Sequence, residues 1–294
     1  MRDLGRVGVW LGSIALEPSA VERDAVKKLE ALGYGSVWFG ESPFNREAFA
    51  HAATLLGATE RIVVATGIAT IWARDAIAMA NGTNALAEAF PGRFLLGMGV
   101  SHSALAPMRG KEYVRPLETM RSYLDEMDAA QYRMPLPPER APVVIAALAP
   151  RMLALAAART DGTHPYLVTP DHTRIARAAI GPDKLLLPEQ AVVLSTDPEV
   201  ARAAGREHLA MYLRLGNYVN SWRRLGFEEA DFAEGGSDRL VDGLVAWGDE
   251  EAVAARIRAH LDAGADHVCV QAISDDPLAP GLGQYERLAP ALLG

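Results

Sequence analysis

The sequence predicts an α/β protein whose parallel strands form a (β/α)8 TIM barrel, with an insertion near the barrel mouth before the last strand. Eight short apolar runs alternate with longer amphipathic stretches, which is the pattern of strand–helix units around a parallel sheet. Eight such units fit the roughly 250 residues of a TIM barrel. The last run lies near the C-terminus and could pair with the first, so we favour a barrel over a doubly wound sheet.

The expected strands are rich in β-branched residues, and several are apolar at consecutive positions. That pattern is typical of strands buried on both faces in a parallel sheet. In chain order the runs are 7–11, 36–39, 62–66, 94–98, 143–146, 163–167, 191–194 and 267–271.

Amphipathic or Ala/Leu-rich stretches between these runs are the expected helices. They cover 20–32, 48–56, 75–89, 151–159 and 250–263. Gly33 and Gly264 stand where helices would end, Pro150 where one would begin, and Asp249 where an N-cap is expected. Residues 194–267 are too many for one crossover, so we expect a helical insertion at about 215–248 within one domain spanning 1–294.

Composition argues against several classes of protein. Half of the 294 residues are hydrophobic and the formal net charge is −8, which argues against disorder and against nucleic acid as the main partner. No apolar run is long enough to span a membrane, and no signal-peptide pattern opens the chain. The single cysteine, Cys269, lies in an apolar run, where we expect it to be buried. We expect a cytoplasmic protein.

Motifs for several chemistries are absent from the sequence. It has no GxxxxGK[ST] phosphate loop, no HExxH helix, no GxSxG elbow and no HxH pair. A G-x-G at Gly97 and Gly99 has His102 in place of the third glycine of a dinucleotide fingerprint. With no CxxC pair either, we expect no metal site.

In a barrel, chemistry takes place at the carboxyl ends of the strands. Those positions carry Glu41 and Ser42, then 66–70, then Gly99, Ser101 and His102, then 146–151, then His164 and Tyr166, and finally Gln271. One carboxylate, two histidines and small residues suit an organic cofactor that supplies the reactivity, while the protein supplies shape and hydrogen bonds.

Several segments together resemble the bacterial luciferase-like monooxygenase family. They are 33–41, 60–68 followed by 84–86 and 91–99, then 142–147 and 155–162, with a further match at 264–271. The segments 164–166, 217–218 and 237–240 are similar to a branch of coenzyme F420-dependent oxidoreductases. The resemblance implies a barrel that binds a flavin or a deazaflavin at the strand ends.

The resemblance also implies which residues hold the cofactor. A non-proline cis peptide at Gly67–Ile68 would form a backrest for the ring. Other residues expected at the cofactor are Glu41, Thr66, Gly99 and Ser101. The phosphate would lie where a helix begins, at Ala147, Leu148, Ala149 and Arg151, although relatives often carry two glycines where this chain has Ala147-Leu148.

Proton transfer near neutral pH favours a histidine, with a carboxylate as a further possibility. Relatives often have a histidine after the acidic residue, but this chain has Ser42, so His102 and His164 are the candidates beside Glu41. Trp72, Tyr166 and Trp222 are candidates for the substrate pocket. A packing or surface role is the alternative for each of these side chains.

The sequence therefore predicts an oxidoreductase that transfers a hydride between coenzyme F420 and a small organic substrate, either a ketone/alcohol pair or an activated C=C bond. The alternatives are a monooxygenase that uses reduced FMN and oxygen, and a non-catalytic flavin-binding barrel. We expect a homodimer formed through the helices at 48–56 and 75–89, as in relatives. The substrate and the direction of the reaction stay open.

Overall fold

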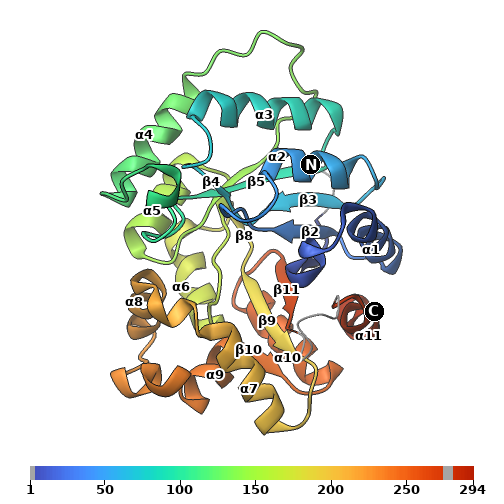
Figure 1. Cartoon of the computed structure of the whole chain (residues 1–294), viewed down its shortest axis with the longest axis vertical. Coiled ribbons are helices and arrows are strands. Elements are labelled where there is room, and N and C mark those ends of the chain that lie inside the picture. The colour runs from blue at the N-terminus through green and yellow to red at the C-terminus, as the bar shows by residue number, and fades with distance from the viewer. Residues whose placement is uncertain (1–3, 274–280) are drawn as a thin grey trace.

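A curled parallel sheet surrounded by helices gives the chain a TIM-barrel-like fold (Figure 1). The computed structural model describes residues 4–273 and 281–294. The strands are β1 (Val7–Trp10), β2 (Ser36–Phe39), β3 (Val63–Thr66), β4 (Ala69–Thr70), β5 (Phe94–Gly99), β6 (Val143–Ile145), β7 (Gly162–Thr163), β8 (Leu185–Leu186), β9 (Glu189–Val193), β10 (Val245–Trp247) and β11 (Val268–Ala272).

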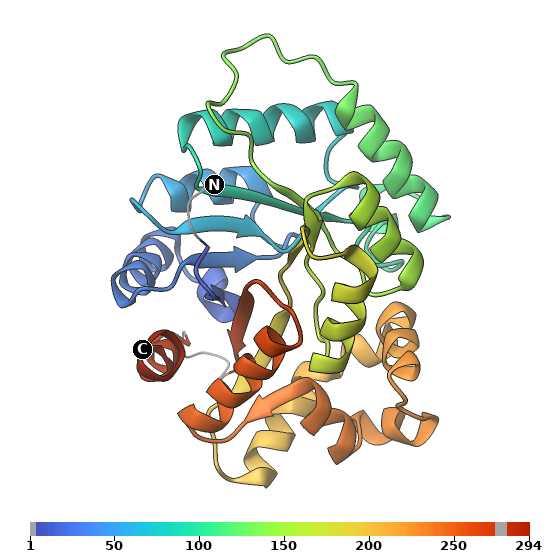
Figure 2. The same ribbon diagram turned by 180° about the vertical axis from the view of Figure 1, so that it is seen from behind.

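The helices lie on the outside of the sheet. They are α1 (Ser19–Leu32), α2 (Ala48–Leu56), α3 (Ala76–Ala89), α4 (Pro116–Asp128), α5 (Pro150–Arg159), α6 (Pro170–Ile180), α7 (Pro198–Leu209), α8 (Gly216–Arg224), α9 (Asp238–Leu244), α10 (Glu250–Asp262) and α11 (Leu282–Leu293), with the short 3-10 helices η1 (Gly12–Leu16), η2 (Pro107–Arg109), η3 (Tyr212–Arg214) and η4 (Glu229–Gly235). On the side seen in Figure 2, α5, α6 and α10 lie in front of part of the sheet.

The sheet curls back on itself through residues 185–193. The order of paired strands runs β11-β1-β2-β3-β5-β6-β7-β8, and β9 pairs with β11. On one side of this stretch, Leu187 N donates to Thr163 O (3.0 Å). On the other side, Cys269 N donates to Pro188 O (2.9 Å). The stretch therefore lies between the sixth and the last strands of the predicted barrel.

The predicted strands are found in the predicted order, with differences at their ends. The prediction at 163–167 was wrong over most of its length, because β7 ends at Thr163. Pro165 has no N–H to give to a ladder, and Leu167 has a positive φ of 52°. The short strands β4, β8 and β10 were not predicted, because two or three residues give no readable periodicity.

The interior of the barrel is apolar at its centre. Its buried side chains form one cluster that includes Trp38, Val63, Ala65, Leu95, Val144, Leu187 and Cys269. Intervening residues such as Val64 and Leu96 belong to the separate layer between sheet and helices, as the alternation of a strand requires. Cys269 is fully buried, as predicted.

Between β9 and β11 the chain leaves the barrel and returns to it. Trp222 on α8 is fully buried, and its Nε1 donates to the backbone oxygen of Leu167 (3.1 Å). At the other end of this region, β10 pairs with β9, with Val245 opposite Ala191. The division of the chain into one domain with an insertion at 215–248 stays a prediction. In the described part of the chain, no helix is both long and apolar enough to cross a membrane.

Candidate active site

Small residues and one large ring lie at the carboxyl ends of the first strands. A Cβ added to Gly67 would lie 2.5 Å from Cζ3 of Trp10, so only glycine allows the indole to lie against this backbone. A Cβ at Gly40 would also contact Trp10, at 3.6 Å. The Gly67–Ile68 peptide is cis, as the resemblance implies. Trp10 therefore lies at the centre of the mouth, a position that the sequence analysis missed.

His164 lies beneath Trp10 inside the barrel. Its ring is stacked between Trp38 and Trp10, with centroid distances of 4.6 and 5.8 Å. Nδ1 donates to the backbone oxygen of Leu187 (2.6 Å), and Nε2 has no partner within the described residues. Burial lowers the pKa of His164 to about 4, so the ring is neutral near pH 7. A neutral ring whose N–H is already bound is not placed to donate a proton, which favours a supporting role over the predicted catalytic one.

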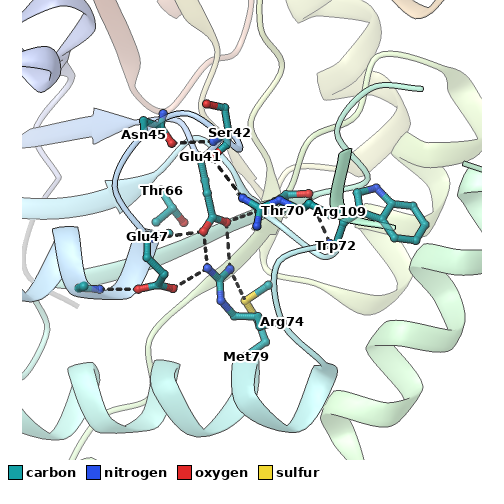
Figure 3. Close-up of polar contacts among 12 residues, drawn as sticks. Glu41, Ser42, Asn45, Glu47, Thr66, Thr70, Trp72, Arg74, Met79 and Arg109 are labelled. Atoms are coloured by element: carbon teal, nitrogen blue, oxygen red, sulfur yellow. Dashed lines mark hydrogen bonds and ion pairs between the residues drawn. The ribbon is translucent and has the colours of Figure 1, made fainter. Parts of the chain in front are cut away.

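Glu41 is the centre of a buried ion-pair network, shown in Figure 3. Its Oε2 accepts from Arg74 Nη1 (3.0 Å) and Thr70 N (2.9 Å), and its Oε1 accepts from Ala48 N (3.2 Å) and pairs with Arg74 Nη2. Arg74 also reaches Glu47 Oε1 (2.5 Å). Because both carboxylate oxygens are engaged, the geometry favours a structural role for Glu41 over proton donation to a ligand.

The Thr66 side chain and the Ser101 backbone shape the carboxyl ends of β3 and β5. The hydroxyl of Thr66 donates to Gly97 O (2.7 Å) and accepts from Gly97 N (3.0 Å), so it joins β3 to β5 and is fully buried. Ser101 has a positive φ of 55° just after β5. Gly99, the last residue of β5, packs against Ile68, since an added Cβ would meet Ile68 Cδ1 at 3.1 Å.

His102 lies close to α8. Its ring lies 5.7 Å from that of Tyr218 on α8. Burial lowers the pKa of His102, while a hydrogen bond with Asn217 acts in the opposite direction. Nδ1 has no partner within the described residues. His102 is therefore a neutral, partly buried base at the rim of the mouth.

The start of α5 has the features expected of an anion site. Ala149 is the N-cap and gives no side-chain cap, Pro150 has no N–H, and Met152 N donates to Ala149 O (3.0 Å), so the N–H of Arg151 is the donor that the first turn leaves for an anion. Arg151 is exposed in the first turn. The backbone oxygen of Leu148 accepts from His172 Nε2 (3.1 Å), and Ala147 is buried. These residues can accommodate a phosphate, although contact with one remains a prediction.

The three predicted pocket residues lie in different environments. Tyr166 is half-buried at the mouth, and its ring is 5.1 Å from that of Trp10. Trp72 lies on the rim, where Nε1 donates to Val100 O (2.6 Å). Trp222 is fully buried, so it supports α8 rather than lining a pocket.

Sequence reasoning did not assign Arg74, Tyr212 or Tyr218, and it gave Gln271 a position but no role. Nothing in the local sequence marks Arg74 or Tyr212, because their partners come from distant segments. Trp10, in contrast, could have been found by applying the strand-end rule to the first strand.

Metal ligands do not gather at this mouth. Across the described residues, no group of three or more His, Cys, Asp or Glu side chains could hold a metal ion. Surface cavities lie elsewhere, one beside Arg140 and Asp161 and another beside Arg206 and Ser237. The mouth itself combines aromatic rings, neutral histidine and hydroxyl groups, which defines a site for an organic cofactor.

The barrel and this mouth define the class of protein. Residues 3–267 match the family model described as luciferase-like monooxygenase. The chain belongs to this family and is an oxidoreductase of the luciferase-like class, dependent on F420 or a flavin.

Individual relatives are distant but cover nearly the whole chain. A relative from Mycobacterium tuberculosis, provisionally named coenzyme F420-dependent oxidoreductase Rv3520c, is 23% identical over 91% of this chain and 95% of its own. The structure of an F420-dependent secondary alcohol dehydrogenase in complex with an F420-acetone adduct is similar, with a TM-score of 0.76 and 15% identity over all of both chains. The structure of a type II Baeyer–Villiger monooxygenase from Pseudomonas putida in complex with FMN has a TM-score of 0.69 and 15% identity, covering 97% of this chain and 95% of that one.

Proposed function

We propose that this protein transfers a hydride between coenzyme F420 and a small organic substrate, with a secondary alcohol and its ketone as the favoured pair. The observation that carries the proposal is the composition of the mouth, where aromatic rings and neutral hydrogen-bonding groups meet without a free carboxylate or a metal cluster in the described residues. A relative with an F420-dependent name and a similar structure with an F420 adduct support it. A reduction of an activated C=C bond would use the same mouth.

The residues present fit such a cofactor. The planar ring would lie by Gly67, Ile68 and Gly99, with the cis Gly67–Ile68 peptide as its backrest. The phosphate would lie at the uncapped start of α5, near Arg151. When bound, the deazaflavin supplies a two-electron carrier that accepts or gives a hydride. Within the described residues, Nδ1 of His102 at the rim has no hydrogen-bond partner, so it is available to a bound group.

His102 is the residue that we propose to move the proton. A secondary alcohol loses its hydroxyl proton when it is oxidised, and a neutral imidazole can accept that proton at Nδ1. In the opposite direction the imidazolium returns it to the oxygen of the ketone. Trp10 and Tyr166 pack against each other at the mouth, and this aromatic surface would limit the access of water to a bound substrate.

Turnover of a panel of secondary alcohols with F420 tests the proposal. Oxidation should be followed by the loss of fluorescence of the oxidised deazaflavin, with FMN in its place as a control. His102→Gln should lower turnover by at least 100-fold while leaving F420 affinity nearly unchanged, since a general base contributes about 100- to 10,000-fold. Unchanged turnover in this variant would refute the assignment of His102, and no turnover of any alcohol or alkene would contradict the hydride-transfer function.

FMN-dependent monooxygenation remains a second candidate because the FMN complex of the Baeyer–Villiger enzyme has the same fold. We also propose that the protein is a homodimer that uses the outer faces of α2 and α3, where the large side chain of Ile77 is exposed. The mass of the protein in solution tests this, and a monomer would contradict it.

A further inference from the structure

Three polar side chains at the mouth form a continuous hydrogen-bond chain. The hydroxyl of Tyr212 donates to the hydroxyl of Tyr166 (3.0 Å), and Tyr166 donates to Oε1 of Gln271 (2.7 Å). They come from η3, from the segment after β7 and from β11. Since three separate parts of the fold contribute to it, this hydrogen-bond chain depends on the tertiary structure and not on local sequence.

Aromatic rings surround this chain on several sides. Tyr166 lies against Trp10 (5.1 Å between centroids), and Tyr218 is edge-on to Tyr212 (5.0 Å) and to Tyr166 (6.3 Å). Tyr166, Tyr212 and Gln271 are each half-buried, so a small molecule in the mouth can reach them. The result is an aromatic wall that carries one row of hydrogen-bonded polar groups, which suits a mostly apolar molecule with one oxygen.

The backbone around Tyr166 is held from two directions. The next residue, Leu167, has its N–H bound by Glu189 Oε2 (3.1 Å) and its carbonyl bound by Trp222 Nε1 (3.1 Å). Glu189 comes from the barrel wall and Trp222 from α8. The position of the Tyr166 hydroxyl is therefore set by the barrel and by α8 together.

The direction of the chain decides what it can bind. A tyrosine hydroxyl has one proton and two lone pairs. Both protons are committed, that of Tyr212 to Tyr166 and that of Tyr166 to Gln271. Burial keeps the two phenols protonated, since it raises the pKa of Tyr212 to about 12 and also raises the pKa of Tyr166 well above its usual value. The positions that remain open on both hydroxyls are lone pairs, which accept a hydrogen bond but do not donate one.

We propose that the Tyr212–Tyr166–Gln271 chain determines specificity for a small, mostly apolar alcohol, by accepting a hydrogen bond from the hydroxyl of that alcohol when it first binds. In the reaction of the proposed function, the same hydroxyl would turn from the tyrosines to His102 before its proton is transferred. A ketone of the same shape has no proton to offer and binds more weakly at the same place. The identity of the alcohol as substrate rests on the proposed function. Recognition of the hydroxyl does not rest on the proposed function, because it involves only side chains of the protein and no cofactor.

Binding of cyclohexanol and cyclohexanone to the cofactor-free protein tests the proposal. The protein is labelled with 5-fluorotryptophan, and fluorine NMR follows the Trp10 signal, which is assigned from its loss in Trp10→Phe. Wild type should bind cyclohexanol more tightly than cyclohexanone. Tyr166→Phe and Tyr212→Phe should each weaken cyclohexanol binding by about 3- to 10-fold, the range of one neutral hydrogen bond, and leave cyclohexanone unchanged.

A matched control and a reversed preference complete the test. Tyr34→Phe removes a buried hydroxyl that donates to Tyr285 O (2.8 Å) away from the mouth, and it should leave both affinities unchanged. Gln271→Leu frees the proton of Tyr166, so cyclohexanone should bind more tightly than it does to wild type. This variant keeps the proposal testable if a tyrosine variant does not fold, which circular dichroism would reveal.

Three results would overturn the proposal: no binding of cyclohexanol by wild type, equal binding of the two ligands, or an unchanged preference in the variants. A preference for cyclohexanol that persists in a protein without F420-dependent turnover would contradict the proposed function and leave the specificity chain standing. F420-dependent turnover together with equal binding of cyclohexanol and cyclohexanone would support the proposed function and overturn the proposed role of the Tyr212–Tyr166–Gln271 chain.

Discussion

Replacing Glu41 with glutamine distinguishes a structural carboxylate from a catalytic one. The Glu41 side chain is 1% exposed and that of Arg74 is 8% exposed, so the pair is almost completely removed from water. Removing one partner of a buried ion pair costs about 3–5 kcal/mol, because the other charge remains buried. In the variant, Arg74 keeps its ion pair with Glu47, and the side-chain oxygen of the new glutamine can still accept one backbone N–H hydrogen bond. We therefore expect a loss of stability at the low end of this range, about 3 kcal/mol.

Urea unfolding of Glu41→Gln measures this loss of stability, and a thermal melt should show a decrease in Tm of about 6–12 °C. The matched control is Glu251→Gln, which breaks an exposed pair with Arg258 and should cost less than about 1 kcal/mol. A loss below about 1 kcal/mol for Glu41→Gln, together with abolished turnover, would refute the structural account and restore Glu41 as a catalytic group.

Further predictions concern the support of the mouth. Gly67→Ala should destabilise the protein by about 1–3 kcal/mol, because the new Cβ would lie 2.5 Å from Trp10. The control is Gly216→Ala, whose new Cβ would have no atom within 4 Å and which should not destabilise the protein. Equal unfolding midpoints of the two variants in urea would contradict this prediction. Trp222→Phe should cost at least about 1 kcal/mol, measured in the same way, because it removes both the hydrogen bond to Leu167 and part of a fully buried ring, and an unchanged midpoint would contradict this. Burial raises the pKa of Glu189 to about 8 from its usual 4.5, so its contribution to stability is complete below pH 4.5 and is lost as the pH rises toward 8. Glu189→Gln should therefore gain stability relative to wild type as the pH rises over that window, and a difference independent of pH would contradict the raised pKa.

The sequence predicts the fold well where an element has its own signal. The runs at 36–39 and 94–98 consist mostly of apolar residues, and the structure has β2 and β5 there. Helix ends are also local signals, as Gly33 shows with its φ of 99° after α1. β7 was predicted too long because composition outweighed Pro165, which breaks the ladder after Thr163.

The candidate site could be predicted only in part, because its chemistry depends on partners that meet in three dimensions. The sequence places Glu41 at a strand end, but it does not reveal that Arg74 and the N–H groups of Ala48 and Thr70 engage both carboxylate oxygens. It places His164 equally well, but stacking between two tryptophans is a tertiary contact. Strand-end reasoning thus finds positions, and the packing around each position decides its role.

Titration of the purified cofactor-free protein with F420 and, separately, with FMN tests the central claim most directly. Fluorescence follows the binding of each. The account predicts saturable binding of F420 and much weaker binding of FMN. Tighter binding of FMN would favour a monooxygenase, and binding of neither would contradict the account, because it would show that the mouth around Gly67 and the start of α5 do not hold such a cofactor.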